Sequence, residues 1–138
     1  LARTYRRFVS DAWPAPHQAA GARLRAAITR HPVMLGGEGR LCTEILRVTG
    51  GRVLGKVGAE GVYALASAAP RAQERARAFA LKIEDGAPRA VYPLVLALAT
   101  RLGMLSGEEA ERLLPFCGAT LSNHQGELVG ALRPRIAS

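Results

Sequence analysis

Two short runs rich in Val, Leu and Tyr, residues 52–57 and 61–66, are separated only by residues 58–60, which include a glycine. Two such runs joined by a glycine-containing connection are typical of a β-hairpin. A third run, residues 77–83, alternates large apolar residues with smaller or charged ones, as a strand with one apolar face does. Three consecutive strands joined by turns predict an antiparallel sheet covered by helices.

The spacing of apolar residues predicts helices on both sides of these strands. The expected helices are residues 3–12, 18–30, 43–48, 88–102 and one that begins at Ser106. Ser106 and Glu109 have the spacing of a capping box, residues 127–136 are typical of a terminal strand, and residues 68–76 are expected to form a mobile loop. The predicted fold class is therefore α+β: an antiparallel sheet of about four strands packed with helices, in a single domain of residues 1–138.

The charge of the chain is basic but diffuse. Nineteen basic residues against eleven acidic ones give a net charge of +8, and all the basic residues except Lys56 and Lys82 are arginines. Such an arginine bias, together with abundant Ala and Gly, is typical of high-GC coding. The arginines are spread along the chain, whereas a nucleic-acid binder concentrates its charge on a face or tail. Nucleic-acid binding is therefore the least favoured function.

The sequence shows neither a membrane segment nor a secretion signal. No apolar run reaches the roughly 18 residues of a membrane span, and no apolar block follows the arginines near the start. Cys42 and Cys117 are too far apart for a zinc ribbon or a disulfide framework, so both are expected to be free, buried thiols. We expect a cytoplasmic protein without membrane contacts.

Motifs for catalysis are missing except around one lysine. The chain contains neither Gly-x-Ser-x-Gly nor Ser-x-x-Lys, and residues 50–56 fail as a phosphate-binding loop because Val57 replaces the required Ser or Thr. Lys56 lies in a predicted strand beside Gly55 and Gly58, and glycine in a strand often marks a close approach of the backbone to a ligand. Because lysine can lose its proton and arginine cannot, Lys56 is the candidate catalytic residue. The alternative is an exposed hairpin lysine.

Three blocks of sequence, residues 33–43, 51–63 and 80–90, resemble the C-terminal half of the bacterial L-asparaginase II family of the Rhizobium type. The most specific stretch is Lys-Val-Gly-Ala-Glu-Gly-Val-Tyr at residues 56–63, and the resemblance covers about residues 23–103. It implies an amidohydrolase that converts L-asparagine to L-aspartate and ammonia. It also implies a fold similar to that of serine β-lactamases and glutaminases.

The resemblance implies roles for individual residues as well. The family uses pairs of serine and lysine, and Lys56 matches the lysine that comes from the sheet and must give up its proton to act as a base. Gly58 and Glu60, in the same block, are the candidate substrate-binding residues, with L-asparagine as the substrate. The family's Ser-x-x-Lys helix, its second serine and its cysteine and lysine metal ligands have no counterpart here. We therefore expect no cofactor on this chain, and any metal site in the other half of the enzyme.

These departures predict a chain that is inactive alone, as either the C-terminal portion of a longer enzyme or a truncated gene product. Its partner is then the N-terminal half of the same enzyme or a second copy in a homo-oligomer. Phe79, Leu81 and Ile83, or their neighbours, are expected to form an exposed apolar patch for that partner. Lys56 is expected to point to the concave side of the sheet. The alternatives are an inactive module that self-associates or binds a partner, and a basic nucleic-acid-binding domain.

Overall fold

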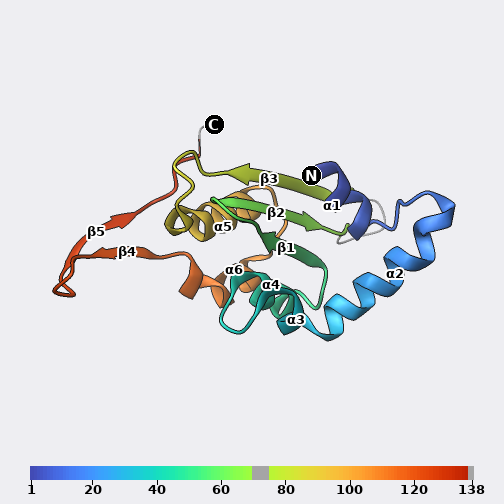
Figure 1. The fold of residues 1–138 in the computed structure, drawn as a ribbon, viewed down its shortest axis with the longest axis horizontal. Coiled ribbons are helices and arrows are strands. Elements are labelled where there is room, and N and C mark those ends of the chain that lie inside the picture. Colours follow the sequence, from blue (N-terminus) through green and yellow to red (C-terminus); the bar gives the residue numbers. More distant parts are fainter. Residues whose placement is uncertain (70–74, 137–138) are drawn as a thin grey trace.

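A three-stranded antiparallel sheet forms the centre of the molecule (Figure 1). The computed structural model describes residues 1–69 and 75–136, so most of the loop predicted at residues 68–76 lies outside the described residues. The predicted hairpin and the predicted third strand are both confirmed. In order across the sheet, the strands are β1 (Val53–Val57), β2 (Val62–Ser67) and β3 (Arg77–Lys82).

The register of the strands decides which side chains share a face. Lys56 on β1 lies opposite Ala64 on β2, which in turn lies opposite Ala80 on β3. Opposed residues of antiparallel strands point to the same face, and successive residues along a strand alternate between the faces. Leu54 and Lys56 therefore point to one face of the sheet, and Val57 points to the other.

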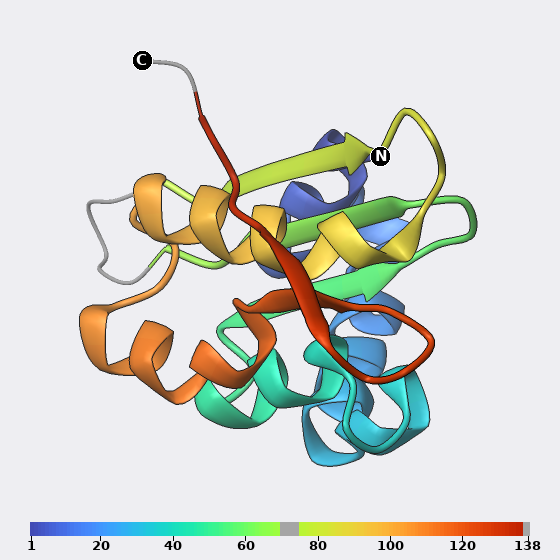
Figure 2. The ribbon, with the colours of Figure 1, turned by 90° about the vertical axis from the view of Figure 1, so that its left-hand side faces the viewer.

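α5 (Val91–Arg101) covers the face to which Val57 points, and lies in front of the strands in Figure 2. A 3₁₀ turn, Pro88–Ala90, precedes α5, so the helix predicted at residues 88–102 is confirmed with an irregular first turn. Its nearly continuous apolar sequence lets α5 bury several sides at once. The main core beneath it consists of Leu41, Cys42, Ile45, Val53, Tyr63, Leu65, Val91, Val95, Leu96, Ala99, Met104, Leu105 and Leu113.

The prediction of an exposed apolar patch on β3 is wrong. Phe79, Leu81 and Ile83 are half-buried and pack against the main core. The same chain covers this face with α5, so these three residues need no partner to shield them from water. The large apolar side chains that are exposed lie elsewhere, at Leu1, Leu24, Met34, Leu102, Leu114, Leu128 and Val129.

α1 (Ala2–Val9) and α2 (Ala15–Arg30) contribute to a second core on the opposite face. α2 begins earlier than the predicted residue 18, because proline is tolerated in the first turn of a helix. With 16 residues, α2 buries none of them fully. Neither α2 nor any other helix in the described part of the chain has the length and apolar content to cross a membrane. The second core consists of Val9, Leu46, Leu54 and Ala66, with Tyr5, Phe8, Ile28, Leu35, Ala68, Ala76 and Ala78 against them.

Two short helices, α3 (Pro32–Gly36) and α4 (Leu41–Val48), connect α2 to β1. α4 confirms a predicted helix, whereas α3 was not predicted because Gly36 and its neighbours indicated a loop. Gly36 ends α3 where there is no room for a side chain, since a Cβ there would lie 2.5 Å from Thr43 Oγ1. That hydroxyl donates a hydrogen bond to the carbonyl oxygen of Gly37 at 2.6 Å, which joins α4 to the end of α3.

The C-terminal segment forms an arm that projects from the body (Figure 1). α6 (Gly107–Arg112) begins with the predicted capping box, in which Ser106 Oγ accepts the Glu109 N–H at 3.2 Å and the Glu109 carboxylate accepts the Ser106 N–H at 2.8 Å. β4 (Ala119–Ser122) and β5 (Leu128–Leu132) then form a separate two-stranded sheet. The α+β class is confirmed, but the predicted terminal strand pairs with the unpredicted β4 and does not join the main sheet.

Candidate functional site around Lys56

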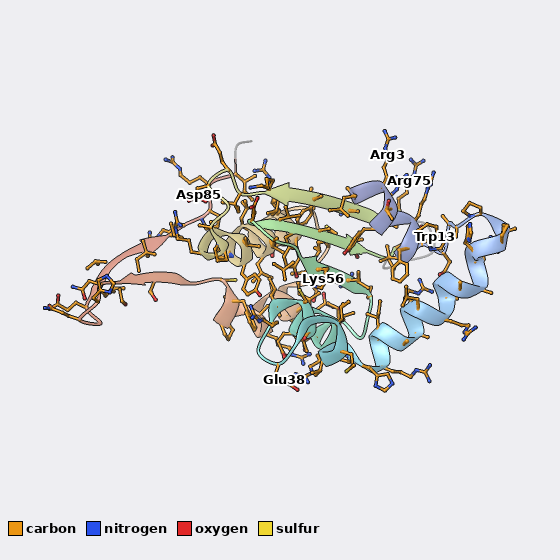
Figure 3. All side chains as sticks on the ribbon, in the orientation of Figure 1. Arg3, Trp13, Glu38, Lys56, Arg75 and Asp85 are labelled. Atoms are coloured by element: carbon orange, nitrogen blue, oxygen red, sulfur yellow. The ribbon has the colours of Figure 1, made fainter. Side chains whose placement is uncertain are left out.

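Lys56 lies on β1 near the middle of the view in Figure 3, whereas Glu38 and Asp85 lie near its edges. Its side chain is half-buried on the face that carries the second core, and its Nζ donates a hydrogen bond to the carbonyl oxygen of Val57 at 2.9 Å. Within residues 1–69 and 75–136, no carboxylate lies at ion-pair distance from this ammonium group. The predicted orientation toward a serine-bearing helix stays a prediction.

A cavity of about 190 Å³, which we call the Lys56 cavity, contains this lysine in its wall. Lys56 is the one charged residue of the lining that the described residues form. Tyr5 contributes the other polar group, and its partial burial raises the pKa of its phenol, to which the nearby Cys42 thiol adds. The remaining walls come from α1, α2, α3 and β1 and are apolar: Phe8, Leu24, Ile28, Leu35 and Leu54.

The Lys56 cavity adjoins an apolar groove of about 450 Å³ between α2 and α3. Three residues, Leu24, Ile28 and Leu35, line both the cavity and the groove. The groove is completed by Ala27, His31 and Met34. Lys56 lines the cavity and not the groove, and the shared walls come from α2 and α3, far from Lys56 in the sequence.

Gly58 and Glu60 lie in the exposed turn between β1 and β2 and do not line the Lys56 cavity. Gly58 donates its N–H to the carbonyl oxygen of Val62 at 2.8 Å. Glu60 and Gly61 have φ angles of 52° and 71°, as the two central residues of a type I′ hairpin turn require. These residues therefore shape the turn, and the structure does not bring Gly58 or Glu60 into one cavity with Lys56. Their role in substrate binding stays a prediction.

A buried thiol and a buried phenol, neither of them a predicted site residue, lie next to β1. Cys42 on α4 is free and fully buried, and its Sγ accepts a hydrogen bond from the Val57 N–H at 3.3 Å. Tyr63 Oη is also buried and makes no hydrogen bond to the described residues. Burial raises the pKa of Tyr63 well above its ordinary value, and the neighbouring Cys42 thiol raises it further.

Gly55 is the sequence signal that could have located this pair. A Cβ at Gly55 would lie only 2.5 Å from Tyr63 Oη and 2.9 Å from Leu65 Cδ1. Glycine at this strand position was expected to mark the approach of a ligand to the backbone. The structure shows instead that it makes room for the Tyr63 phenol of the neighbouring strand.

Arg52, at the start of β1, ties the sheet to the C-terminal segment. Its guanidinium lies 2.5 Å from the Glu109 carboxylate and donates to Ser67 Oγ and to the Met104 carbonyl oxygen, both at 3.0 Å. Burial tends to raise the pKa of Glu109, but the Ser106 N–H and the Arg52 guanidinium together outweigh burial and lower it. Arg52 is therefore held in a structural network.

The arginines that lie on α2 or next to it do not form a cationic surface without carboxylates. A cleft of about 540 Å³ is lined by Arg25, Arg30 and Arg52 together with smaller residues. Arg25 is paired with Asp11, and Arg52 is paired with Glu109. Two of the three guanidinium groups are thus already neutralised by carboxylates of the same chain.

A comparison with protein families agrees with the sequence blocks. A family model described as L-asparaginase II matches residues 1–134 of the chain. The chain belongs to the L-asparaginase II family. No curated protein matches the chain. The family match extends beyond residues 23–103, and it includes α1, α2 and the arm formed by β4 and β5. All the walls of the Lys56 cavity therefore lie within the part of this L-asparaginase II chain that the family shares.

The described residues of this L-asparaginase II chain include no group of three His, Cys, Asp or Glu side chains placed to hold a metal ion. Cys42 is buried against β1, and Cys117 lines a different cavity next to α5 and α6. Burial raises the pKa of the Cys117 thiol, which disfavours the thiolate that a metal would need. The cysteine and lysine ligands that the resemblance implies have no counterpart in the chain, so these residues do not fit a metal.

Proposed function

We propose that this chain is the lysine-bearing part of an amidohydrolase that converts L-asparagine and water to L-aspartate and ammonia. Membership of the L-asparaginase II family supports the reaction class. The observation that carries the proposal is Lys56 itself. It lies in the most specific sequence block, half-buried in a cavity wall, and no carboxylate of the described residues neutralises it.

In this proposal, Lys56 transfers the proton. A serine hydroxyl attacks the amide carbon of L-asparagine, and its proton passes to the side-chain nitrogen of Lys56, which acts as the base. The amine then returns the proton to the leaving nitrogen, which departs as ammonia and leaves an ester on the serine. Water then attacks this ester, and its proton passes through Lys56 to the serine oxygen as L-aspartate is released. The place of Lys56 in the wall of the Lys56 cavity supports this role.

The serine of this scheme comes from a segment outside these 138 residues. The Lys56 cavity is lined by a tyrosine but by no serine or threonine of the described residues. The sequence also contains no Ser-x-x-Lys. The proposal therefore assigns this chain the base, and assigns the nucleophile to the N-terminal half implied by the resemblance.

Ammonia release from L-asparagine tests the proposal. The intact enzyme, which carries the serine-bearing segment, is expected to release ammonia from L-asparagine, and the 138-residue chain alone is expected to release none. Mixing the chain with the separately prepared serine-bearing segment is expected to restore part of the activity. An intact enzyme that releases no ammonia from L-asparagine overturns the proposed reaction. Activity of the chain alone overturns the assignment of the nucleophile.

A further inference from the structure

The Lys56 cavity and the groove between α2 and α3 are neighbours that share three lining residues, and we call the two together the Lys56 groove. Leu24, Ile28 and Leu35 line both parts of it. Two of its large apolar side chains are strongly exposed, with 55% of Leu24 and 87% of Met34 accessible to solvent. Exposed apolar side chains that gather around a depression are typical of a binding site.

The charge in the Lys56 groove is concentrated at one end. Lys56 lines the cavity. The other ionisable side chains that a ligand would meet are the Tyr5 phenol in the cavity and the His31 imidazole in the groove. The Lys56 ammonium donates to the Val57 carbonyl oxygen, and the described residues offer it no carboxylate. A cation among apolar walls is stabilised by an anion that enters with its own charge. The groove is therefore complementary to a molecule with an anionic head and an apolar tail.

The size of the cavity favours a small molecule over a protein segment. An α-helix with its side chains is about 10 Å wide, which exceeds what a cavity of about 190 Å³ can admit. A flexible alkyl chain is narrower than a helix, and Leu24, Ile28 and Leu35, which line both the cavity and the wider groove of about 450 Å³, are the apolar side chains that it would contact.

We propose that the Lys56 groove binds an aliphatic carboxylate, with its head at the Lys56 ammonium and its tail against Leu24, Ile28 and Leu35. This inference goes beyond the proposed hydrolysis, because it concerns a ligand whose tail lies along the groove between α2 and α3 and which is not hydrolysed. The binding is non-covalent and does not depend on the missing serine. A protein without asparaginase activity would therefore still be expected to bind the aliphatic carboxylate.

Trp13 provides a reporter for this binding. It is the only tryptophan of the chain, and its ring meets the ring of Phe8 edge-on, with the centroids 6.4 Å apart. Phe8 lines the Lys56 cavity. Titration of the protein with decanoate, kept below its micelle-forming concentration, is expected to give a saturable change in Trp13 fluorescence. 1-Decanol, which has the same tail without the charge, is expected to bind about two- to fivefold more weakly, the range expected for loss of an ion pair that is not fully buried.

The two lysines supply a matched pair of variants. Lys56→Met keeps the apolar stem and removes the charge, so it is expected to abolish the preference for decanoate while 1-decanol still binds. Lys82→Met is the control, because Lys82 is exposed, lines none of the cavities around Lys56, and also donates to the carbonyl of the next residue. It is expected to leave both affinities unchanged.

Three outcomes overturn the proposal. The first is equal affinity for decanoate and 1-decanol in the unaltered protein, and the second is an unchanged preference in Lys56→Met. The third concerns occupancy by a second copy of the chain. In that case the unaltered protein sediments as a dimer, and Met34→Glu converts it to a monomer. Decanoate then binds only to the monomeric variant, or to neither protein. This combination would show that the groove is a protein interface.

Discussion

Lys56 and Lys82 are the only lysines of the chain, and they make the same local contact in different surroundings. Each Nζ donates to the carbonyl oxygen of the following residue, Val57 or Ile83. Lys56 lies in the wall of a cavity, whereas Lys82 is exposed on the edge strand β3. A comparison of variants at the two positions therefore separates the effect of the cavity from the effect of the local hydrogen bond.

Replacement of Lys56 is expected to lower asparagine turnover in the intact enzyme. Lys56→Ala should reduce kcat by on the order of 10² or more, because a general base contributes about that factor. Lys56→Arg should recover little, since a guanidinium keeps its proton. Ammonia release measures the effect, circular dichroism checks the fold, and Lys82→Ala serves as the control. Full activity of Lys56→Ala would refute the catalytic role of this lysine.

Replacement of Gly55 is expected to destabilise the chain through Tyr63. In Gly55→Ala the new Cβ would meet Tyr63 Oη at 2.5 Å, and such overpacking costs about 1–3 kcal/mol of unfolding free energy. Tyr63→Phe removes the crowded hydroxyl, so the double variant should recover part of the loss in urea denaturation. Gly107→Ala is the control, because a Cβ at Gly107 has nothing within 4 Å. Equal stability of Gly55→Ala and Gly107→Ala would contradict the close approach.

Among the elements, β4 and β5 have the least support from the rest of the fold. Among the strands of the described residues they pair only with each other, and Leu128 and Val129 on β5 are exposed. An isolated two-stranded hairpin is at best marginally stable in water, because it has little core to bury. The contrast is with β2, which pairs on both edges and whose residues are almost all buried.

Hydrogen exchange should therefore separate the two sheets. Backbone amides of β4 and β5 are expected to exchange much faster than those of β2, since local opening of the arm exposes little apolar surface. Exchange measured residue by residue by NMR checks this expectation, with the edge strand β3 as an intermediate case. Equal protection of β5 and β2 would mean that the arm packs on something, such as a second copy of the chain.

At the scale of the whole molecule, Arg52 and Glu109 join segments far apart in the sequence. The pair connects the start of β1 to the first turn of α6, and both side chains are largely shielded from water. The Glu109 carboxylate also completes the capping box through the Ser106 N–H. The Glu109 carboxylate therefore stabilises the first turn of α6 and also the contact of α6 with the sheet.

The lowered pKa of Glu109 predicts a loss of stability in acid. A carboxyl whose pKa is lower in the folded chain stabilises the fold above its unfolded pKa of about 4.3. This contribution is lost as the pH falls through the folded pKa. Glu109→Gln should therefore be less stable than the unaltered protein at pH 7, and the difference should shrink near pH 3. Urea denaturation at both pH values measures it, with Glu111→Gln on the exposed side of α6 as the control. A difference that stays constant with pH would refute the role of the Glu109 charge.

Short-range signals in the sequence were enough to predict the hairpin between β1 and β2, the capping box of Ser106 and Glu109, and the α+β class. Each depends on residues within a few positions of one another, where turn geometry and capping act directly. The block around Lys56 was also enough to indicate the L-asparaginase II family. β4 and α3 escaped prediction, because β4 gains its structure from pairing with β5, and α3 from contacts with α4 around Gly36 and Thr43.

Only the tertiary structure decided what surrounds Lys56. Strand alternation shows that Lys56 shares a face with Leu54, but not which helices cover that face. The cavity walls come from α1, α2, α3 and β1, and their meeting depends on long-range packing that no local pattern encodes. The same reason explains why the apolar side chains of β3 pack against the main core of their own chain, against expectation. Local sequence thus determined the strand and the lysine, and long-range packing decided that the lysine lies in an apolar groove without a carboxylate of the described residues beside it.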